Sequence, residues 1–242
     1  MRPVLSVVIP AFDEAERIGP TLRATVAWLE TFGHPTEILV VDDGSRDGTA
    51  GVVRELAKTL ASRQVALEVV ESFPNRGKGH VVKAGMLTAK GDLRLFMDAD
   101  NSTPVSELPK LLARVQAGAD VAIGSRRAPG AQMARRPPWY RRLWSRIANR
   151  IVQAGLLGGI HDTQCGFKLF TAEAAEAVFA RVRTSGWGFD LEALALARRL
   201  GHRIDEVPVT WTDDRRTRIR PIRDAIRITI EFLRIRRALA QS

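Results

Sequence analysis

The fold of this chain is constrained most by short β-branched runs, each followed by a proline or by a polar turn. Val4 to Ile9 (VLSVVI) ends at a proline, and Glu37 to Val41 (EILVV) ends at an Asp-Asp-Gly-Ser turn. Such runs are typical of buried strands. Between them, Thr21 to Phe32 carries apolar residues at helical spacing. Strands that alternate with helices through short connections predict an α/β fold, with a mostly parallel sheet and helices on both faces.

The same alternation continues to residue 124. It predicts helices at Thr49 to Leu60 (with Asp47 as the N-cap), Lys78 to Thr88 and Val105 to Gln116, and strands at Val65 to Glu71, Asp92 to Met97 and Asp120 to Gly124. In open sheets of this kind, ligands bind beyond the carboxyl ends of the strands. Polar residues occupy four of those ends: Pro10 to Glu14, Asp42 to Ser45, Asp98 to Asp100, and Gly124 to Arg126.

The second half is less regular, and Ala128 to Arg142, rich in Pro, Gly and Arg, predicts a loop. Further expected elements are helices at Leu143 to Leu157, Ala172 to Ala180, Asp190 to Leu200 and Ile222 to Leu239, a strand or extended loop at Asp162 to Phe170, a strand at Ile204 to Trp211, and a charged loop at Asp213 to Arg220.

The composition narrows the possible partners. Lys and Arg total 37 against 27 Asp and Glu, so the net charge is +10 and anionic partners are expected: nucleic acid, a membrane surface or phosphorylated substrates. The single cysteine, Cys165, indicates a reducing compartment. The first apolar run, Val4 to Ile9, is too short for a signal peptide, and no run approaches the roughly 18 residues of a membrane span. We expect a soluble or peripheral protein.

Two aspartates in LFMDADNSTP suggest a cation site. Asp98 and Asp100 lie two residues apart, so in an extended backbone both point to one side. Two carboxylates at such a short separation repel one another, and a divalent cation relieves that repulsion. Mg²⁺ or Mn²⁺ held there could neutralise a diphosphate leaving group. The alternative is that Asp98 or Asn101 only caps the next turn.

The other acidic strand ends also have two interpretations. Asp42 and Asp43 could accept hydrogen bonds from a nucleobase or a ribose, or could be ordinary turn residues. Glu14 could bind the same ligand, or could only begin a helix near its positive end.

The ordered motifs IPAFDE, VVDDGSRDGT, NRGKG, DADNSTP and GSR resemble the nucleotide-diphosphosugar glycosyltransferases of family 2. DTQCGFKLF, GWGFDLEALALARRLG and EVPVTWTD resemble the polyprenyl-phosphate sugar synthases within it, and NRGKG and VTWTD favour the dolichyl-phosphate glucosyltransferase branch over the mannose branch. The resemblance covers about Val4 to Trp211. It implies a GT-A catalytic domain over residues 1–211. The residues that follow, 212–242, predict a basic loop and an amphipathic helix that could lie at a membrane interface.

The resemblance also implies roles for individual residues. Nucleotide-binding residues would be Pro10, Ala11, Phe12, Glu14, Asp42, Asp43, Lys78 and Asp98. The ion, Mg²⁺ or Mn²⁺, would be held by Asp98 and Asp100, with Ser102 where the mannose branch has a glutamine. Catalytic residues would be Asp100, Asp190 and Arg126. Acceptor or phosphate contacts would come from Arg126, Arg127, Ser145, Asp162, Gln164 and Lys168.

The reaction that this implies is inverting transfer of a hexose to a polyprenyl phosphate, with UDP-glucose as the favoured donor and GDP-mannose the second choice. A phosphate acceptor, whose second pKa is about 6, is itself the nucleophile, so Asp190 would orient a sugar hydroxyl. A soluble hydroxyl acceptor would instead need Asp190 as a general base. A third hypothesis is a basic nucleic-acid or membrane adaptor with an inactive site.

Two arginine clusters and the last predicted helix favour the membrane interpretation. The clusters are Arg126, Arg127, Arg135, Arg136, Arg141, Arg142, Arg146 and Arg150, and then Arg215, Arg216, Arg218 and Arg220. Trp139 and Tyr140 could stack on bases, but no nucleic-acid motif accompanies them. The helix Ile222 to Leu239 has a wide apolar arc suited to a membrane interface, or to packing on the domain or a second subunit. We therefore expect a cytoplasmic protein, peripheral on the cytoplasmic face of a membrane, that binds no nucleic acid and could be oligomeric.

Overall fold

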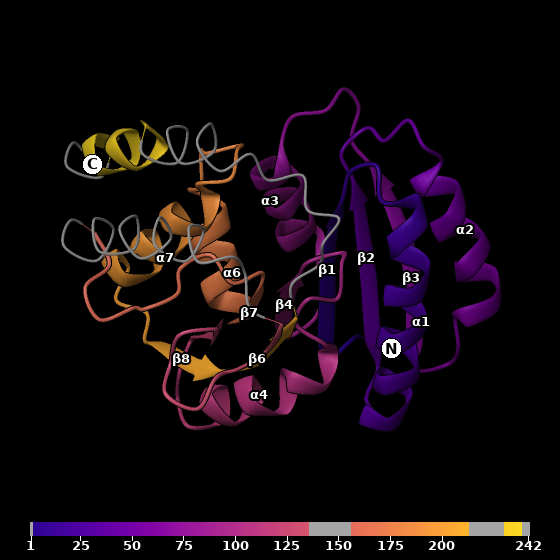
Figure 1. The fold of residues 1–242 in the computed structure, drawn as a ribbon, viewed down its shortest axis with the longest axis horizontal. Helices are drawn as coiled ribbons and strands as arrows, with labels where there is room; N and C mark the ends of the chain where they lie inside the picture. Colours follow the sequence, from indigo (N-terminus) through magenta and orange to yellow (C-terminus); the bar gives the residue numbers. More distant parts are fainter. Residues whose placement is uncertain (1, 136–155, 213–229, 239–242) are drawn as a thin grey trace.

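The computed structural model describes residues 2–135, 156–212 and 230–238 (Figure 1). Within these residues, one sheet has the strand order β3-β2-β1-β4-β7-β5-β8, and β6 and β9 form a small second sheet. The strands are β1 (Leu5–Ala11), β2 (Thr36–Asp42), β3 (Val65–Glu71), β4 (Leu93–Met97), β5 (Val121–Ser125), β6 (Gln132–Arg135), β7 (Phe167–Thr171), β8 (Ile204–Pro208) and β9 (Thr210–Thr212).

Helices cover both faces of the main sheet, as the sequence predicts. They are α1 (Ala15–Phe32), α2 (Thr49–Leu60), α3 (Lys78–Thr88), α4 (Leu108–Gln116), α6 (Ala172–Phe179) and α7 (Phe189–Arg199). Side chains of β1 alternate between two hydrophobic cores. Val7 and Ile9 share one core with α1, α2 and α4, and Val8 shares the other with α3, α6 and α7. Because β1 is covered on both faces, all seven of its residues are buried.

The antiparallel strand β7 lies between β4 and β5, whereas β1, β2, β3 and β4 pair in parallel. The prediction of a mostly parallel sheet is therefore confirmed. Since β7 runs against its neighbours, the residues just before it meet the carboxyl end of β4. Asp98 N–H donates to the Gly166 carbonyl at 3.0 Å there. The insertion of β7 therefore places the segment around Gly166 beside Asp98, at the carboxyl end of β4.

In the first half, most predicted bounds agree with the structure to within two residues, and two differ more. Helix α1 begins at Ala15, six residues before the predicted start, because Ile18 and Leu22 pack in the core on either side of Pro20. The segment predicted as a helix from Val105 begins as a 3₁₀ turn, Val105–Glu107, and becomes α-helical at Leu108.

The segment Asp162 to Phe170, predicted as a strand or extended loop, is irregular up to Gly166 and forms β7 from Phe167. Two other predictions for the second half are corrected. The expected loop from Ala128 contains β6. The segment Ile204 to Trp211 is two strands rather than one. Val209 N–H donates to the Ser125 carbonyl, and the Val209 carbonyl accepts from Gln132 N–H, so the chain passes at this residue from the main sheet to the small one.

The C-terminal segment 230–238 is helical and packs on the domain. Phe232 and Ile235 are buried in the core that α7 shares, whereas Ile230 and Leu233 are 44% and 46% exposed. The remainder of the predicted helix Ile222 to Leu239, the loop Asp213 to Arg220 and nearly all of the helix Leu143 to Leu157 lie outside the described residues. No helix in the described ranges combines the length and the apolar character needed to cross a membrane.

Candidate active site

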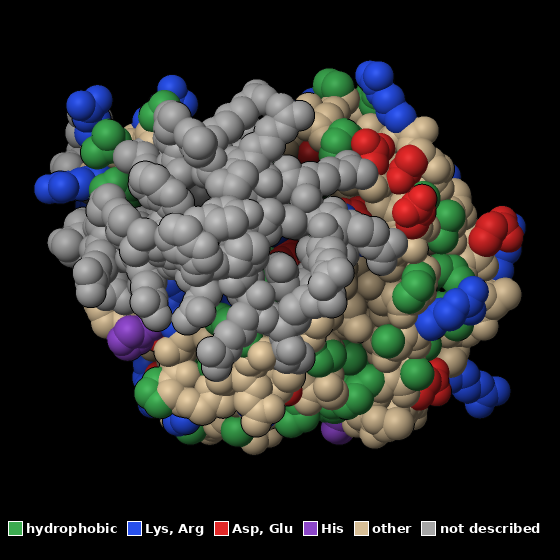
Figure 2. All heavy atoms as spheres, in the orientation of Figure 1, with side chains coloured by type: hydrophobic (Ala, Val, Ile, Leu, Met, Phe, Trp, Pro, Cys, Tyr) green, Lys and Arg blue, Asp and Glu red, His purple; other side chains and the backbone are tan. Residues whose placement is uncertain are grey.

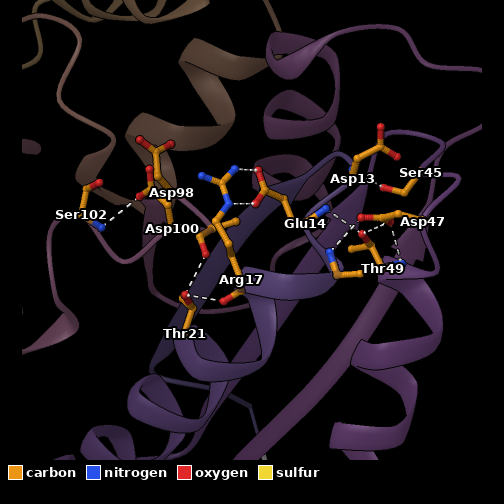
Figure 3. A network of polar contacts seen from close by, with 12 residues as sticks. Asp13, Glu14, Arg17, Thr21, Ser45, Asp47, Thr49, Asp98, Asp100 and Ser102 are labelled. Atoms are coloured by element: carbon orange, nitrogen blue, oxygen red, sulfur yellow. Dashed lines mark hydrogen bonds and ion pairs between the residues drawn. The ribbon is translucent and has the colours of Figure 1, made fainter. Parts of the chain in front are cut away.

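The carboxyl ends of β1 and β2 are joined by a polar network (Figure 3). Asp47 accepts hydrogen bonds from Thr49 N–H and Ala15 N–H at 3.0 Å each, and so holds the starts of α1 and α2 together. The N-cap position of α2 is Gly48 rather than the predicted Asp47, whose carboxylate caps the helix from one residue earlier. Burial alone would raise the pKa of Asp47, but the hydrogen bonds from Thr49 and Ala15 lower it overall.

Asp42 and Asp43 are both buried at the end of β2, but they have different partners. Asp42 accepts from the Ser45 hydroxyl and backbone N–H. Asp43 accepts from Arg76 N–H and Gly77 N–H at 2.8 Å each, and therefore fixes the NRGKG loop that precedes α3. Carboxylate oxygens have further lone pairs, so these bonds leave capacity for a ligand.

Glu14 pairs with Arg17, a residue that the sequence did not indicate. Arg17 Nε donates to Glu14 Oε2 at 2.6 Å, and both side chains are about 15% exposed. Thr21 Oγ1, one turn further along α1, donates to the Ala99 carbonyl within the D-x-D segment. In the view of Figure 3, the Arg17 guanidinium lies between Glu14 and the aspartates of that segment.

A hollow of about 560 Å³ adjoins this network, and its lining is mostly charged: Asp13, Glu14, Ala15, Glu16, Arg17, Arg46 and Asp47. Figure 2 shows acidic side chains gathered at the upper right, over the loops that follow β1 and β2. A hollow of this size suits a small-molecule ligand. Phe12, which follows β1, is 40% exposed beside these loops, whereas Pro10 and Ala11 are buried in the strand.

Asp98 and Asp100 follow β4, and the surrounding charges shift the pKa of Asp100. Burial raises that pKa, the negative charge of Asp98 raises it further, and the bond from Ser102 N–H at 2.9 Å opposes the shift. A Cβ at Gly166 would lie 1.9 Å from Asp98 Oδ2, so any side chain there would displace the Asp98 carboxylate from its present position. Ser102 is buried, 8% exposed, and contacts Asp100 through its amide.

The donor set fits a divalent cation held partly by substrate. Two close carboxylates, one of them with a raised pKa, are the environment that such an ion stabilises. The described residues contain no cluster of three or more His, Cys, Asp or Glu side chains with metal-binding geometry. Mg²⁺ commonly uses one or two carboxylates together with phosphate oxygens and water, and Asp98 and Asp100 would meet that need.

Lys78 is the cation beside this pair. Its Nζ is 2.6 Å from Asp98 Oδ1, and it lies over the rings of Phe96 and Trp187, 5.3 and 5.0 Å from their centroids. Burial lowers the pKa of Lys78, but the charges of Asp98 and Asp190 outweigh it and raise the pKa. Lys78 therefore stays protonated at neutral pH.

Arg126 is held by Asp162 on the other side of the site. Arg126 Nε and Nη2 donate to the two Asp162 oxygens at 2.7 and 2.8 Å, and the guanidinium carbon lies 5.3 Å from the Trp211 ring centroid. Burial would raise the pKa of Asp162, but the Arg126 charge lowers it well below its usual range. Glu206 in turn accepts from Asp162 N–H at 2.7 Å. The outer edge of the guanidinium is thus oriented and could meet a phosphate.

Asp190 and Lys168 form a buried pair. Lys168 Nζ lies 2.5 Å from Asp190 Oδ1 and 2.6 Å from the Cys165 carbonyl, and Lys168 is 1% exposed. Burial raises the pKa of Asp190, with the charges of Lys168 and Lys78 opposing that shift. Lys168 Nζ lies 5.6 Å from the centroid of the Phe96 ring, which Lys78 Nζ faces at 5.3 Å, so this pair lies near Lys78 and the D-x-D group.

Gln164 and Arg127 are the remaining predicted site residues that the structure describes. Gln164 is exposed, and Arg127 N–H donates to Ser125 Oγ at 3.1 Å. Burial raises the pKa of Cys165 to about 12, which keeps the thiol protonated and excludes it as a nucleophile at neutral pH. Ser145 and most residues of the two arginine clusters fall outside the described ranges.

Sequence reasoning missed Arg17, Glu206 and Trp187. Arg17 lies one helical turn after Glu14, and this i, i+3 spacing is a signal that could have found it. Glu206 and Trp187 lie in the quoted motifs EVPVTWTD and GWGFDLE, but their partners Asp162 and Lys78 are far away in sequence, so the motifs did not indicate these contacts.

Known proteins resemble this chain over most of its length. The profile described as Glycosyl transferase family 2 matches residues 6–179. A dolichyl-phosphate β-glucosyltransferase of Trichomonas vaginalis is 36% identical over 239 residues, which cover 94% of this chain and 69% of that protein. The Drosophila melanogaster enzyme of the same name is 34% identical, with coverage of 95% and 75%.

A solved structure agrees with the fold. Glucosyl-3-phosphoglycerate synthase from Mycobacterium tuberculosis, crystallised with Mn²⁺, UDP-glucose and phosphoglyceric acid, superposes with a TM-score of 0.71 at 19% identity. The match covers 97% of this chain and 80% of that one. The GT-A fold expected from the motifs is thereby confirmed.

Proposed function

We propose that this chain, which belongs to glycosyl transferase family 2, transfers glucose with inversion from UDP-glucose to a dolichyl-type polyprenyl phosphate. The observation that carries the proposal is similarity over more than nine-tenths of the chain to proteins named dolichyl-phosphate β-glucosyltransferases. UDP-glucose is favoured as donor because the fold neighbour binds it with Mn²⁺. GDP-mannose is the second choice.

In this proposal, the ends of β1 and β2 bind the nucleoside through the residues predicted from the motifs, with Asp42 and Asp43 as the buried acceptors. Asp98 and Asp100 would hold Mg²⁺ or Mn²⁺, which would supply positive charge to neutralise a diphosphate leaving group. Lys78 adds a positive charge beside Asp98, 2.6 Å away. The Ser102 N–H donates to Asp100 and so orients the Asp100 carboxylate.

The acceptor side is formed by Arg126, Arg127 and the segment from Asp162 to Lys168. Arg126 attracts the acceptor phosphate, since its guanidinium is already oriented by Asp162 and Trp211. A phosphate dianion needs no general base, so Asp190 orients a sugar hydroxyl. Its pairing with Lys168 supports this role, because the ammonium stabilises the carboxylate as an acceptor of hydrogen bonds.

We also propose that the protein acts at a membrane surface. Residues 1–211 act as the catalytic domain on the cytoplasmic face of a membrane, and residues 212–242 contact the lipid surface. The exposed Ile230 and Leu233 support this, although Phe232 and Ile235 of the same segment pack on the domain. The charge of +10 favours an anionic lipid surface over a neutral one.

The test is a transfer assay with the full chain, Mn²⁺, polyprenyl phosphate in detergent and either labelled UDP-glucose or labelled GDP-mannose. We expect label to enter the organic phase from UDP-glucose, only when polyprenyl phosphate is present, and to be lost with EDTA. Asp100→Asn is the inactive control. Label from GDP-mannose alone would change the donor, and label that stays in water-soluble product would refute the lipid acceptor.

A soluble acceptor is the second candidate, since the fold neighbour was crystallised with phosphoglyceric acid. Asp190→Asn separates the two: a hydroxyl acceptor that depends on a general base should lose about 100-fold or more in kcat, whereas a phosphate acceptor should lose less. Failure to bind either UDP or GDP with Mn²⁺ would favour the adaptor hypothesis instead.

A further inference from the structure

The loop of residues 183–188 (RTSGWG), called the bridging loop below, connects two distant parts of the molecule. On one side it contacts the start of α3. The Ser185 carbonyl accepts from Gly79 N–H at 2.8 Å and from His80 N–H at 3.3 Å. The bridging loop therefore packs directly on the segment that carries Lys78.

On its other side, the bridging loop is held by two carboxylates. Glu192 of α7 accepts from Arg183 N–H and Thr184 N–H at 3.0 and 2.6 Å. Glu231 of the C-terminal segment accepts from Gly188 N–H at 2.6 Å. A Cβ at Gly188 would lie 2.6 Å from Glu231 Oε2 and 2.9 Å from Glu231 Cβ, so this approach requires glycine.

Trp187 lies in the bridging loop, one residue before the amide that Glu231 holds. Its ring centroid is 5.0 Å from Lys78 Nζ, and Lys78 Nζ is 2.6 Å from Asp98. Trp187 is also 46% exposed, so packing within the core does not by itself fix its ring. The contacts therefore run from Glu231 through Gly188 and Trp187 to Lys78 and the D-x-D group.

We propose that Glu231 is a positioning residue for Lys78, and that it acts by fixing Gly188 and thereby the ring of Trp187. A carboxylate that accepts a backbone N–H makes a strong, charge-assisted bond, which suits this role. The C-terminal segment is thus a support of the nucleotide site, in addition to any contact with lipid. The nucleotide-binding part of the proposal rests on the proposed function.

Hydrogen–deuterium exchange of the full chain without nucleotide tests the proposal independently of the reaction. In Glu231→Ala, we expect faster exchange in peptides covering 183–188 and also in those covering 76–80. Leu233→Ala, an exposed change on the same segment, should alter neither, and peptides of α1 should stay protected in both variants. Faster exchange restricted to the Gly188 amide, or spread over α1 as well, would overturn the proposal.

Nucleotide affinity gives the second readout. Glu231→Ala should weaken UDP binding with Mn²⁺ about threefold to tenfold and raise the donor KM more than it lowers kcat. Glu231→Gln keeps an acceptor for Gly188 and should stay within about twofold of the original chain.

A double-mutant cycle distinguishes positioning through Trp187 from a general structural effect. In a Trp187→Leu background, Glu231→Ala should weaken UDP binding no further. An undiminished effect in that background would refute the route through Trp187. If the unaltered chain binds neither UDP nor GDP, the proposed function fails, and the exchange experiment alone decides the positioning role.

Discussion

The two sides of the site use their charges differently. On the side of β1 and β2, Glu14 pairs with Arg17, but the aspartates accept hydrogen bonds from backbone N–H groups, as Asp43 does from Arg76 and Gly77. On the side of β5, β7 and α7, two buried aspartates pair with cations, Asp162 with Arg126 and Asp190 with Lys168. Loss of a partner is expected to cost more on the second side, because an unpaired charge remains buried there.

Lys168→Met should have the largest effect on stability. It leaves Asp190 buried without its cation, and the expected loss in the free energy of unfolding is about 3–5 kcal/mol. The double variant Lys168→Met with Asp190→Leu should recover most of that loss. Urea denaturation of the three chains measures both effects. If the double variant were no more stable than Lys168→Met, the buried-charge explanation would fail.

Asp100→Asn, in contrast, should lower the rate of sugar transfer strongly and change folding stability hardly at all. Sugar transfer should fall by about 100-fold or more, because the ion loses a carboxylate. The Tm should remain the same or rise, since burial and Asp98 already raise the pKa of Asp100 and disfavour its charge in the folded state. Initial rates at varied Mn²⁺ and a thermal melt test this. A clear drop in Tm would indicate a structural role for Asp100.

Asp162→Asn tests whether the Arg126 pair stabilises the fold as well as orienting the guanidinium. Arg126 is 24% exposed, so the expected loss is smaller, about 2 kcal/mol at pH 7. The pKa of Asp162 is lowered in the folded state. The stabilisation is therefore present above the unfolded pKa of about 3.9 and is lost as the pH falls through the folded pKa.

The measurement is the free energy of unfolding of both chains between neutral pH and about pH 3. The gap between them should stay constant down to about pH 4 and narrow below it. A gap that closed well above that pH would contradict the assignment to Asp162. Asp92→Asn, at an exposed carboxylate that pairs with Arg2, is the matched control and should change stability little.

The contrast between the two sides of the site also explains which features could be predicted from the sequence. Helix α2 and strand β3 agree with their predicted bounds, because the Asp47 carboxylate at the helix start and the alternation of apolar residues along the strand are local signals. The polar strand ends of β1, β2 and β4 do meet, since parallel strands place their carboxyl ends together. The D-x-D segment therefore lies at the edge of the sheet that its position predicted, and its role in holding an ion stays a prediction.

The acceptor side depends on contacts that sequence spacing does not determine. The insertion of β7 between β4 and β5 reverses one strand, and it places Gly166 against Asp98. The pair of Arg126 with Asp162 spans 36 residues, and that of Glu231 with Gly188 spans 43. Such partners follow from tertiary packing, so Asp162 could be named as a site residue but its role as the partner of Arg126 could not.

Asp47→Ala is the smallest expected effect and the sharpest test of the β1 and β2 side. Its carboxylate holds Ala15 and Thr49 by backbone N–H groups, but it is exposed, so we expect a loss of only about 0.5–1 kcal/mol in stability. Asp47→Asn keeps an acceptor oxygen and should lose about half as much. If Asp47→Ala cost as much as Lys168→Met in the same denaturation experiment, backbone-bonded carboxylates would matter as much as buried ion pairs, and the contrast between the two sides would not hold.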